Sequence, residues 1–187
     1  MTTQGFSLLR LPWVALDHVI GSFELPELIL EESHRIPKSS IFAKPSENFE
    51  FPISNFPPQK FQNSLLKLQS ANWITVPILT QFFMEVDILI IEEMSLRIED
   101  ILEFLKIWMT RDSETVQIRM CDTWFTEILE EMEGVLVDEV VLNGMTCPLQ
   151  PGYGFLLEDK SQNRTKKVLA YYGVENMLIF TTKFQLP

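Results

Sequence analysis

The chain contains few residues of the kinds that form cross-links or bind metals. Its 187 residues include two cysteines and two histidines. Cys121 and Cys147 are too few to form a disulfide framework, and neither lies near another Cys or a His at metal-ligand spacing. We therefore expect free or buried thiols in a reducing compartment, with no metal and no other cofactor.

The chain also lacks a long apolar segment. Its most apolar run, residues 86–91, contains Asp87 and lies between Glu85 and Glu92, so it is too short and too charged to span a bilayer. We expect a buried strand there. No positively charged start followed by an apolar segment indicates secretion. The expected location is cytoplasmic or nuclear, because the sequence has no basic import signal that would distinguish the two compartments.

Basic residues are scarce relative to acidic ones. The chain has 15 Lys and Arg against 26 Asp and Glu, a formal net charge of −11. This charge repels phosphate backbones and anionic lipids, so we expect neither nucleic acid nor membrane as a partner. It biases any protein partner toward a basic surface, through an attraction that salt weakens.

No catalytic signature is present. The sequence has no Gly-x-Ser-x-Gly nucleophile motif, phosphate loop, dinucleotide glycine motif or His-Glu-x-x-His metal helix. Two groups of carboxylates can be imagined as acid and base pairs or as a cation site. They are Glu92 with Glu93, and Glu127 with Glu130, Glu131 and Glu133. The second group has the spacing of a solvated helix face, so we predict no enzyme and no catalytic residue.

What the chain does contain is an ordinary globular balance of 46% hydrophobic and 22% charged residues. Short apolar runs at residues 65–68, 88–91, 116–120 and 140–142 recur at intervals of roughly 22 to 29 residues, as in leucine-rich-type repeats. Alternation of such strands with helices implies right-handed crossovers and a largely parallel sheet. The predicted fold class is α/β, with α+β as the alternative.

Three helices are expected between these strands. The first begins after Thr75, with Pro77 in its first turn, and runs to about residue 83. The longest spans about residues 98–109, and the third runs from about residue 124 to 133, where Gly134 stops it. The apolar stripe of the longest helix consists of Ile98, Ile101, Leu102, Leu105, Trp108 and Met109.

The pattern changes after the turn signal Asn143-Gly144. Residues 153–157, 167–172 and 177–182 read as three short strands separated by polar turns. We expect them to form an antiparallel cap that protects the end of the strand-helix array.

Ahead of the array, residues 41–63 mix four prolines with Phe49, Phe51, Phe56 and Phe61. We interpret them as a linker whose aromatic side chains pin it to the neighbouring core. The predicted organisation is a helical segment at 1–40, this linker at 41–63 and a repeat-like domain at 64–187.

The N-terminal segment has the features of a docking element. Pro12 can occupy the first position of a short helix, and Leu16, Val19 and Ile20 then recur on one face. This stretch resembles the first helix of an F-box, the module by which receptors of cullin-type ubiquitin ligases bind a Skp-type adaptor. The resemblance implies adaptor-binding residues Leu8, Leu11, Pro12, Trp13, Leu16, Val19 and Ile20.

The F-box resemblance is partial. Residues 21–26 are shorter than the usual link between the first two helices, and the acidic residues Glu31 and Glu32 stand where a basic patch is expected. Pro26 and Pro37 limit any helix between them to about ten residues.

The rest of the chain resembles the type 2 F-box-associated domain of nematode F-box proteins. The resemblance rests on the order of Trp73-Ile74-Thr75, the strand at 86–92 and the helix residues 99–108, and it covers about residues 65–187. Two departures are Arg97, where the family has a Thr that caps the helix, and Leu102, which replaces an Asn.

This resemblance implies a substrate-recognition subunit of a Skp-cullin-F-box ubiquitin ligase. The N-terminal segment then binds the Skp adaptor of the cullin ligase, and the C-terminal domain binds an unknown target protein for ubiquitin-dependent degradation. The alternative is a stand-alone interaction module whose shortened F-box no longer binds. The sequence identifies neither the target nor the binding face, nor the oligomeric state.

Overall fold

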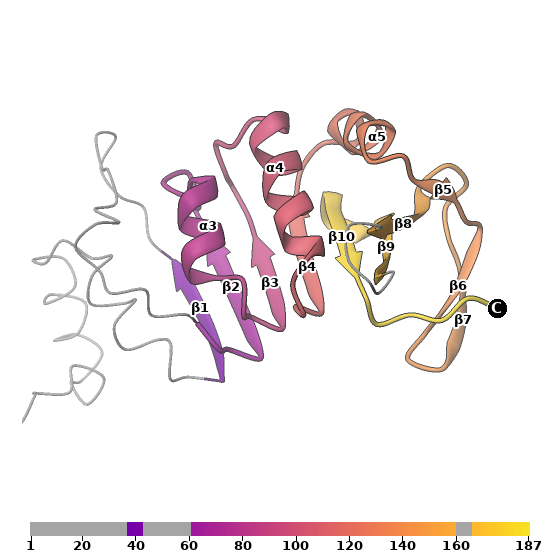
Figure 1. The fold of residues 1–187 in the computed structure, drawn as a ribbon, viewed down its shortest axis with the longest axis horizontal. Helices are drawn as coiled ribbons and strands as arrows, with labels where there is room; N and C mark the ends of the chain where they lie inside the picture. The colour runs from indigo at the N-terminus through magenta and orange to yellow at the C-terminus, as the bar shows by residue number, and fades with distance from the viewer. Residues whose placement is uncertain (1–36, 43–60, 160–165) are drawn as a thin grey trace, which may run out of the picture.

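The computed structural model describes residues 37–42, 61–159 and 166–187. The elements in chain order are β1 (Lys38–Phe42), β2 (Leu65–Gln69), α3 (Val76–Phe82), β3 (Ile88–Ile91), α4 (Ile98–Met109), β4 (Thr115–Arg119), α5 (Asp122–Glu131), β5 (Val135–Leu136), β6 (Glu139–Leu142), β7 (Met145–Pro148), β8 (Gly154–Asp159), β9 (Lys166–Tyr172), the 3-10 turn η3 (Val174–Asn176) and β10 (Met177–Thr181). Figure 1 shows helices α3, α4 and α5 lying along one face of the large sheet.

The large sheet has eight strands in the order β1-β2-β3-β4-β10-β9-β8-β5. The pairings from β1 to β4 are parallel, and the pairings from β4 to β5 through β10, β9 and β8 are antiparallel. The fold is therefore mixed α/β, as the sequence predicted at the level of class. The expectation of a largely parallel sheet is wrong, because the antiparallel strands join the same sheet.

The parallel half follows the strand-helix alternation read from the sequence. Buried residues alternate with half-buried ones along β2, β3 and β4, and the buried set faces helices α3 and α4. Helix α4 has the predicted bounds, but its most buried positions include Phe104, which the predicted stripe omitted. Ile98 and Leu102 are only half-buried. The contact face of α4 is thus rotated toward Phe104.

The start of α4 is fixed in spite of the missing Thr. Arg97 occupies the N-cap, and the Asp100 carboxylate accepts a hydrogen bond from the backbone N–H of Arg97 at 3.0 Å. The Arg97 guanidinium lies 3.4 Å from the same carboxylate oxygen. These bonds lower the pKa of Asp100, the backbone N–H contributing most. One half of a capping box therefore replaces the cap that the family resemblance implied.

The predicted antiparallel cap is present as β8, β9 and β10. Phe125 of α5 anchors the helix to these strands. Its ring stacks on Tyr153 at 5.5 Å between centroids and also contacts Phe155 and Tyr172. These aromatic side chains, together with the buried residues under α3 and α4, form one continuous core.

Three local predictions were wrong. Residues 140–142 form a strand, but they pair with β7 across the Asn143-Gly144 turn in a separate two-stranded sheet. Strand β1 crosses the predicted boundary at residue 40, where the sequence analysis expected no strand. After α5, the left-handed residue is Glu133, with a φ of 53°. Gly134 is needed for another reason: a Cβ there would lie 2.9 Å from Leu157.

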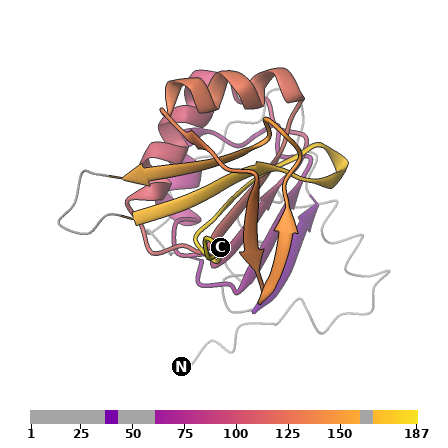
Figure 2. The same cartoon turned by 90° about the vertical axis from the view of Figure 1, so that its right-hand side faces the viewer.

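The β6–β7 hairpin lies on the side of the sheet opposite the helices (Figure 2). Val141 and Gln185 exchange backbone hydrogen bonds of 2.8 and 3.0 Å, which hold the hairpin to the C-terminal residues. Behind it, Leu149 packs on Gly154, where an added Cβ would approach the Leu149 side chain to 2.3 Å. Val140 of β6 and Leu169 of β9 are fully buried outside the main core. The antiparallel half is therefore covered on both faces.

Several predictions concern residues that the structure does not describe. They are the helical segment up to residue 36, its adaptor-binding residues Leu8, Leu11, Pro12, Trp13, Leu16, Val19 and Ile20, and the linker residues Phe49, Phe51 and Phe56. Within the described part of the linker, Phe61 is buried and packs on Phe83 at 5.0 Å between ring centroids. The prediction of pinning is confirmed for Phe61.

Candidate functional site

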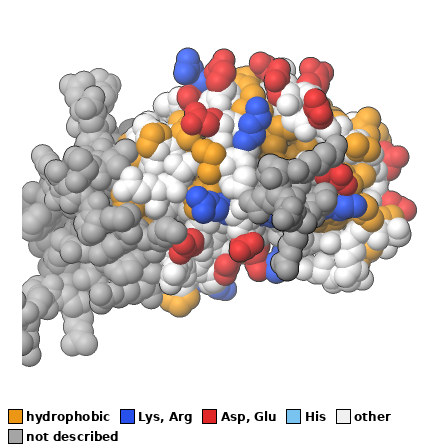
Figure 3. Space-filling model, viewed as in Figure 1, with side chains coloured by type: hydrophobic (Ala, Val, Ile, Leu, Met, Phe, Trp, Pro, Cys, Tyr) orange, Lys and Arg blue, Asp and Glu red, His pale blue; other side chains and the backbone are white. Residues whose placement is uncertain are grey.

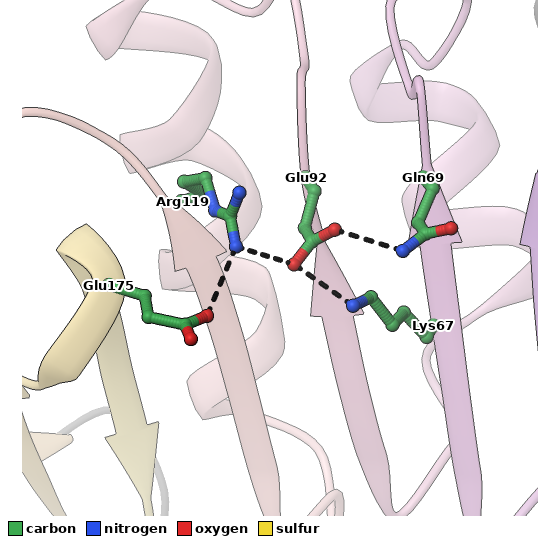
Figure 4. A network of polar contacts seen from close by, with 5 residues as sticks. All are labelled: Lys67, Gln69, Glu92, Arg119 and Glu175. Carbon is green, nitrogen blue, oxygen red and sulfur yellow. Dashed lines mark hydrogen bonds and ion pairs between the residues drawn. The ribbon is translucent and has the colours of Figure 1, made fainter.

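The parallel half presents one face of the sheet away from the helices, here called the open face. By strand register it includes Leu65, Lys67 and Gln69 from β2, Ile88 and Ile90 from β3 with Glu92 just after it, Thr115, Gln117 and Arg119 from β4, and Ile179 from β10. The apolar members of this face are half-buried. Helices α3 and α4 lie on the other side of the strands and do not cover it (Figure 4). This face combines an apolar floor with a polar rim.

Glu92 is the centre of the polar rim. Its side chain is only 10% exposed, and one carboxylate oxygen lies 2.9 Å from Nη2 of Arg119 and 3.1 Å from Nζ of Lys67. The other oxygen accepts a hydrogen bond of 3.3 Å from the Gln69 amide (Figure 4). A carboxylate this buried needs such partners, because desolvation of an unpaired charge is costly.

A second carboxylate reaches Arg119 from the turn between β9 and β10. Oε2 of Glu175 lies 3.4 Å from Nη2 of Arg119, and the Glu175 side chain is 77% exposed. Glu175 and Asn176 both have left-handed backbones, with φ of 58° and 59°. Such conformations are uncommon outside glycine and store strain. The strained turn therefore places the Glu175 carboxylate against Arg119 of the polar rim.

Hydrogen bonds fasten this turn to the end of β4. The backbone N–H of Met120 donates to the carbonyl of Asn176 at 3.0 Å, and the Tyr172 hydroxyl donates to the Met120 carbonyl at 3.1 Å. Nε of Arg119 is buried and has no hydrogen-bond acceptor among the described residues. The described residues thus leave one buried donor of the rim without an acceptor.

The rim lies where the parallel strands β2, β3 and β4 end. In open α/β sheets, the carboxyl ends of parallel strands are the usual place for ligand-binding residues. From the sequence, Glu92 was considered as a charge that flanks an apolar run and, with Glu93, as a carboxylate pair, whereas Lys67, Gln69, Arg119 and Glu175 were not selected. One signal was present in the sequence. Lys67 and Arg119 follow apolar residues in strands of alternating polarity, a pattern that places them on the face away from the core.

The arrangement is suited to binding. Its charges are balanced between two cations and two carboxylates, and these groups already pair with one another. Across the described ranges, no group of three or more His, Cys, Asp or Glu residues is placed to hold a metal ion. What the face offers a partner is apolar area beside hydrogen-bonding groups in fixed positions.

The two thiols are free, as predicted, and they lie elsewhere. Cys121 is exposed at the start of α5, with its sulfur 3.1 Å from the Thr123 hydroxyl. The hydrogen bond from Thr123 contributes most to a lowered pKa of this thiol, followed by the backbone N–H of Trp124. Cys147 is half-buried near Tyr171, and burial, with a smaller contribution from Cys147, raises the pKa of that tyrosine.

The helical layer is acidic. Helices α4 and α5 contain seven acidic residues and one basic residue. Glu127, Glu130, Glu131 and Glu133 are all exposed, as the sequence predicted. Figure 3 shows the helical side of the molecule, and acidic side chains gather along its upper edge over α4 and α5. The open-face rim is therefore the more basic surface of the two.

Comparison of the chain with protein-family models, with curated proteins and with solved structures gave no match. None of the helices in the described ranges is long and apolar enough to cross a membrane.

Proposed function

We propose that this protein is a non-catalytic substrate receptor of a Skp-cullin-F-box ubiquitin ligase in the cytoplasm or nucleus. The N-terminal segment binds the Skp-type adaptor, and the C-terminal domain at residues 64–187 binds the target protein. The adaptor part of the proposal rests on the sequence resemblance around Leu11, Pro12 and Leu16.

The observation that carries the binding role is the open face. A sheet face that carries the half-buried Ile88, Ile90 and Ile179 beside a fixed rim of Glu92 and Arg119 has the composition of a protein-binding surface. Apolar area supplies affinity, and the ordered charges select which partner fits. We also propose that this domain is related to leucine-rich-type repeats. The support for this relationship is the spacing of its strands along the sequence.

The adaptor role is tested by co-purification of the tagged full-length chain with purified Skp-type adaptor. We expect stoichiometric recovery, and we expect Leu11→Ala combined with Leu16→Ala to weaken it by about tenfold or more, as for two apolar anchors of an interface. Circular dichroism and the unfolding transition of each chain serve as controls for folding. No recovery of adaptor by the folded parent chain would contradict the ligase role.

The target-binding role is tested separately. Ile90→Lys places a charge in the centre of the apolar floor, whereas Leu186→Lys changes an apolar residue that is 44% exposed in the C-terminal tail. We expect Ile90→Lys alone to abolish ubiquitylation of target proteins by the reconstituted ligase, with adaptor recovery unchanged. Equal effects of the two substitutions would argue against the open face.

The alternative is a stand-alone interaction module, and a truncation distinguishes it. The deletion must end before Pro37, because the Pro37 carbonyl accepts hydrogen bonds from the backbone N–H groups of Ser64 and Leu65 at 2.8 and 3.1 Å. It must also spare β1, which pairs with β2. Target binding that survives this deletion, with no adaptor recovered by the full chain, would favour the alternative.

A further inference from the structure

The outermost strand at the antiparallel end, β5, has an unpaired edge in the described part of the chain. It pairs with β8 on one side, with Val135 opposite Leu156 and Leu136 opposite Phe155. The backbone N–H of Val137 donates to the Gly154 carbonyl at 2.9 Å. Backbone groups alternate in direction along an antiparallel strand, so the N–H and C=O of Leu136 point away from the sheet.

Both side chains of this strand are apolar and exposed. Val135 is 64% exposed and Leu136 is 58% exposed. Proteins commonly protect edge strands with Lys or Pro, which prevent pairing with other chains. Strand β5 has neither residue. The edge therefore offers backbone hydrogen-bonding groups together with apolar contacts on both faces of the strand.

The residues around β5 are acidic. Residues 130–139 contain five acidic residues and no basic one. The acidic members, Glu130, Glu131, Glu133, Asp138 and Glu139, are all exposed and lie before and after the strand. A surface of one sign attracts segments of the opposite sign and repels like ones.

We propose that β5 binds an extended, basic segment of a partner protein, which adds to the sheet as a further strand. Backbone hydrogen bonds to Leu136 hold the segment, its apolar side chains contact Val135 and Leu136, and its Lys or Arg side chains pair with the flanking carboxylates. Pairing of β5 with a second copy of itself is disfavoured, because it would bring two acidic flanks together. This surface is separate from the open face, because β5 lies at the other end of the sheet from β2, β3 and β4.

The test uses two labelled ten-residue peptides and the full chain. One peptide repeats Lys-Val and the other repeats Glu-Val, so the two have equal length and apolar content but opposite charge. Fluorescence anisotropy should show binding of the Lys-Val peptide, weakening as salt is raised, and at least about tenfold weaker binding of the Glu-Val peptide. Equal binding of the two peptides, or no binding of either, overturns the proposal.

Substitutions in β5 test whether the Lys-Val peptide binds at this strand. Val135→Ser combined with Leu136→Ser should weaken the Lys-Val peptide by about tenfold, and Leu136→Pro should do the same by removing the outward N–H. Val174→Ser is the matched control, because Val174 is an apolar residue that is 85% exposed in η3, away from β5. Unchanged binding by the β5 variants overturns the proposal, as does salt-resistant dimerisation of the parent chain that the β5 variants abolish.

Discussion

The two halves of the large sheet are built differently and differ in what they leave accessible. The parallel half is covered by α3 and α4 on one face, and its other face carries the Glu92 rim. The antiparallel half is covered by α5 on one face and by the β6–β7 hairpin on the other (Figure 2). All-parallel sheets usually have both faces covered and near-continuous apolar strands. Here β2 and β4 alternate in polarity and in burial, so one face of the parallel half is less apolar and less buried than the face under α3 and α4.

The largest effects should come from the core that the two halves share. Phe104 and Phe125 are each fully buried, one under the parallel half and one under the antiparallel half. Phe104→Ala and Phe125→Ala should each lower the free energy of unfolding by about 3–5 kcal/mol. Denaturant titrations followed by circular dichroism and by tryptophan fluorescence should give coincident transitions. Two separate transitions would show that the halves unfold independently.

The covering of the antiparallel half depends on Gly154. A Cβ there would lie 2.6 Å from the backbone oxygen of Val137 as well as against Leu149. Gly154→Ala should therefore cost about 1–3 kcal/mol of unfolding free energy. Gly173→Ala is the control, since its Cβ would come close to the flexible end of Ile179 at 2.8 Å and would lie at an ordinary contact distance of 3.5 Å from the backbone oxygen of Met177. An equal loss for both variants would contradict the proposed close packing of Leu149.

The rim of the parallel half should contribute less to stability. Glu92→Gln leaves Lys67 and Arg119 without their shared carboxylate, and their side chains are 32% and 39% exposed. After allowance for solvent screening, we expect a loss of about 1–2 kcal/mol in thermal or denaturant unfolding. The comparison is Glu158→Gln in the antiparallel half, where the Lys167 pair is long at 3.5 Å and more exposed. Its loss should be below about 0.5 kcal/mol.

A smaller, pH-dependent effect is expected at the start of α4. The lowered pKa of Asp100 means that the unfolded chain binds its proton more readily than the folded chain does. The stabilisation is complete above the unfolded pKa and is lost as pH falls through the lower, folded pKa. Asp100→Asn should therefore reduce the melting temperature at neutral pH and make little difference in strong acid. A constant difference across this range would exclude the Arg97 contact as its cause.

The smallest effect concerns reactivity at the start of α5. The Thr123 hydroxyl helps to lower the pKa of Cys121, so Thr123→Ala should raise that pKa and reduce the thiolate fraction near neutral pH. Alkylation of Cys121 by iodoacetamide should slow by a few-fold, while the half-buried Cys147 reacts as before. Mass spectrometry of the labelled peptides separates the two sites. An unchanged rate at Cys121 would rule out this hydrogen bond as the source of the shift.

The parts of the fold that follow from local patterns were predictable. The periodicity of α4, the strands β2 to β4 and the Asn143-Gly144 turn all depend on residues close together in the chain. Strand β1 was missed because Lys38–Phe42 has a weak strand pattern and pairs only with β2. The sheet to which β6 belongs depends on distant partners, so an apolar run alone could not assign it.

The Glu92 rim was not predictable for the same reason. The contacts of Glu92 with Lys67 and Arg119 join residues from three different strands, and sequence spacing does not reveal that they meet. The Glu175 contact joins positions 56 residues apart. Only the sheet order brings them together, because β10 lies directly beside β4.

That strand order also has a consequence for synthesis on the ribosome. The hydroxyls of Thr115 in β4 and Thr181 in β10 lie 2.9 Å apart, although the residues are 66 positions apart in the chain. A nascent chain can assemble β2, β3 and β4 early, but the free edge of β4 must wait until β10 has emerged. Such long-range pairing slows folding and leaves an edge open to unwanted association. During translation, the middle of the sheet therefore closes only after β10 has been made.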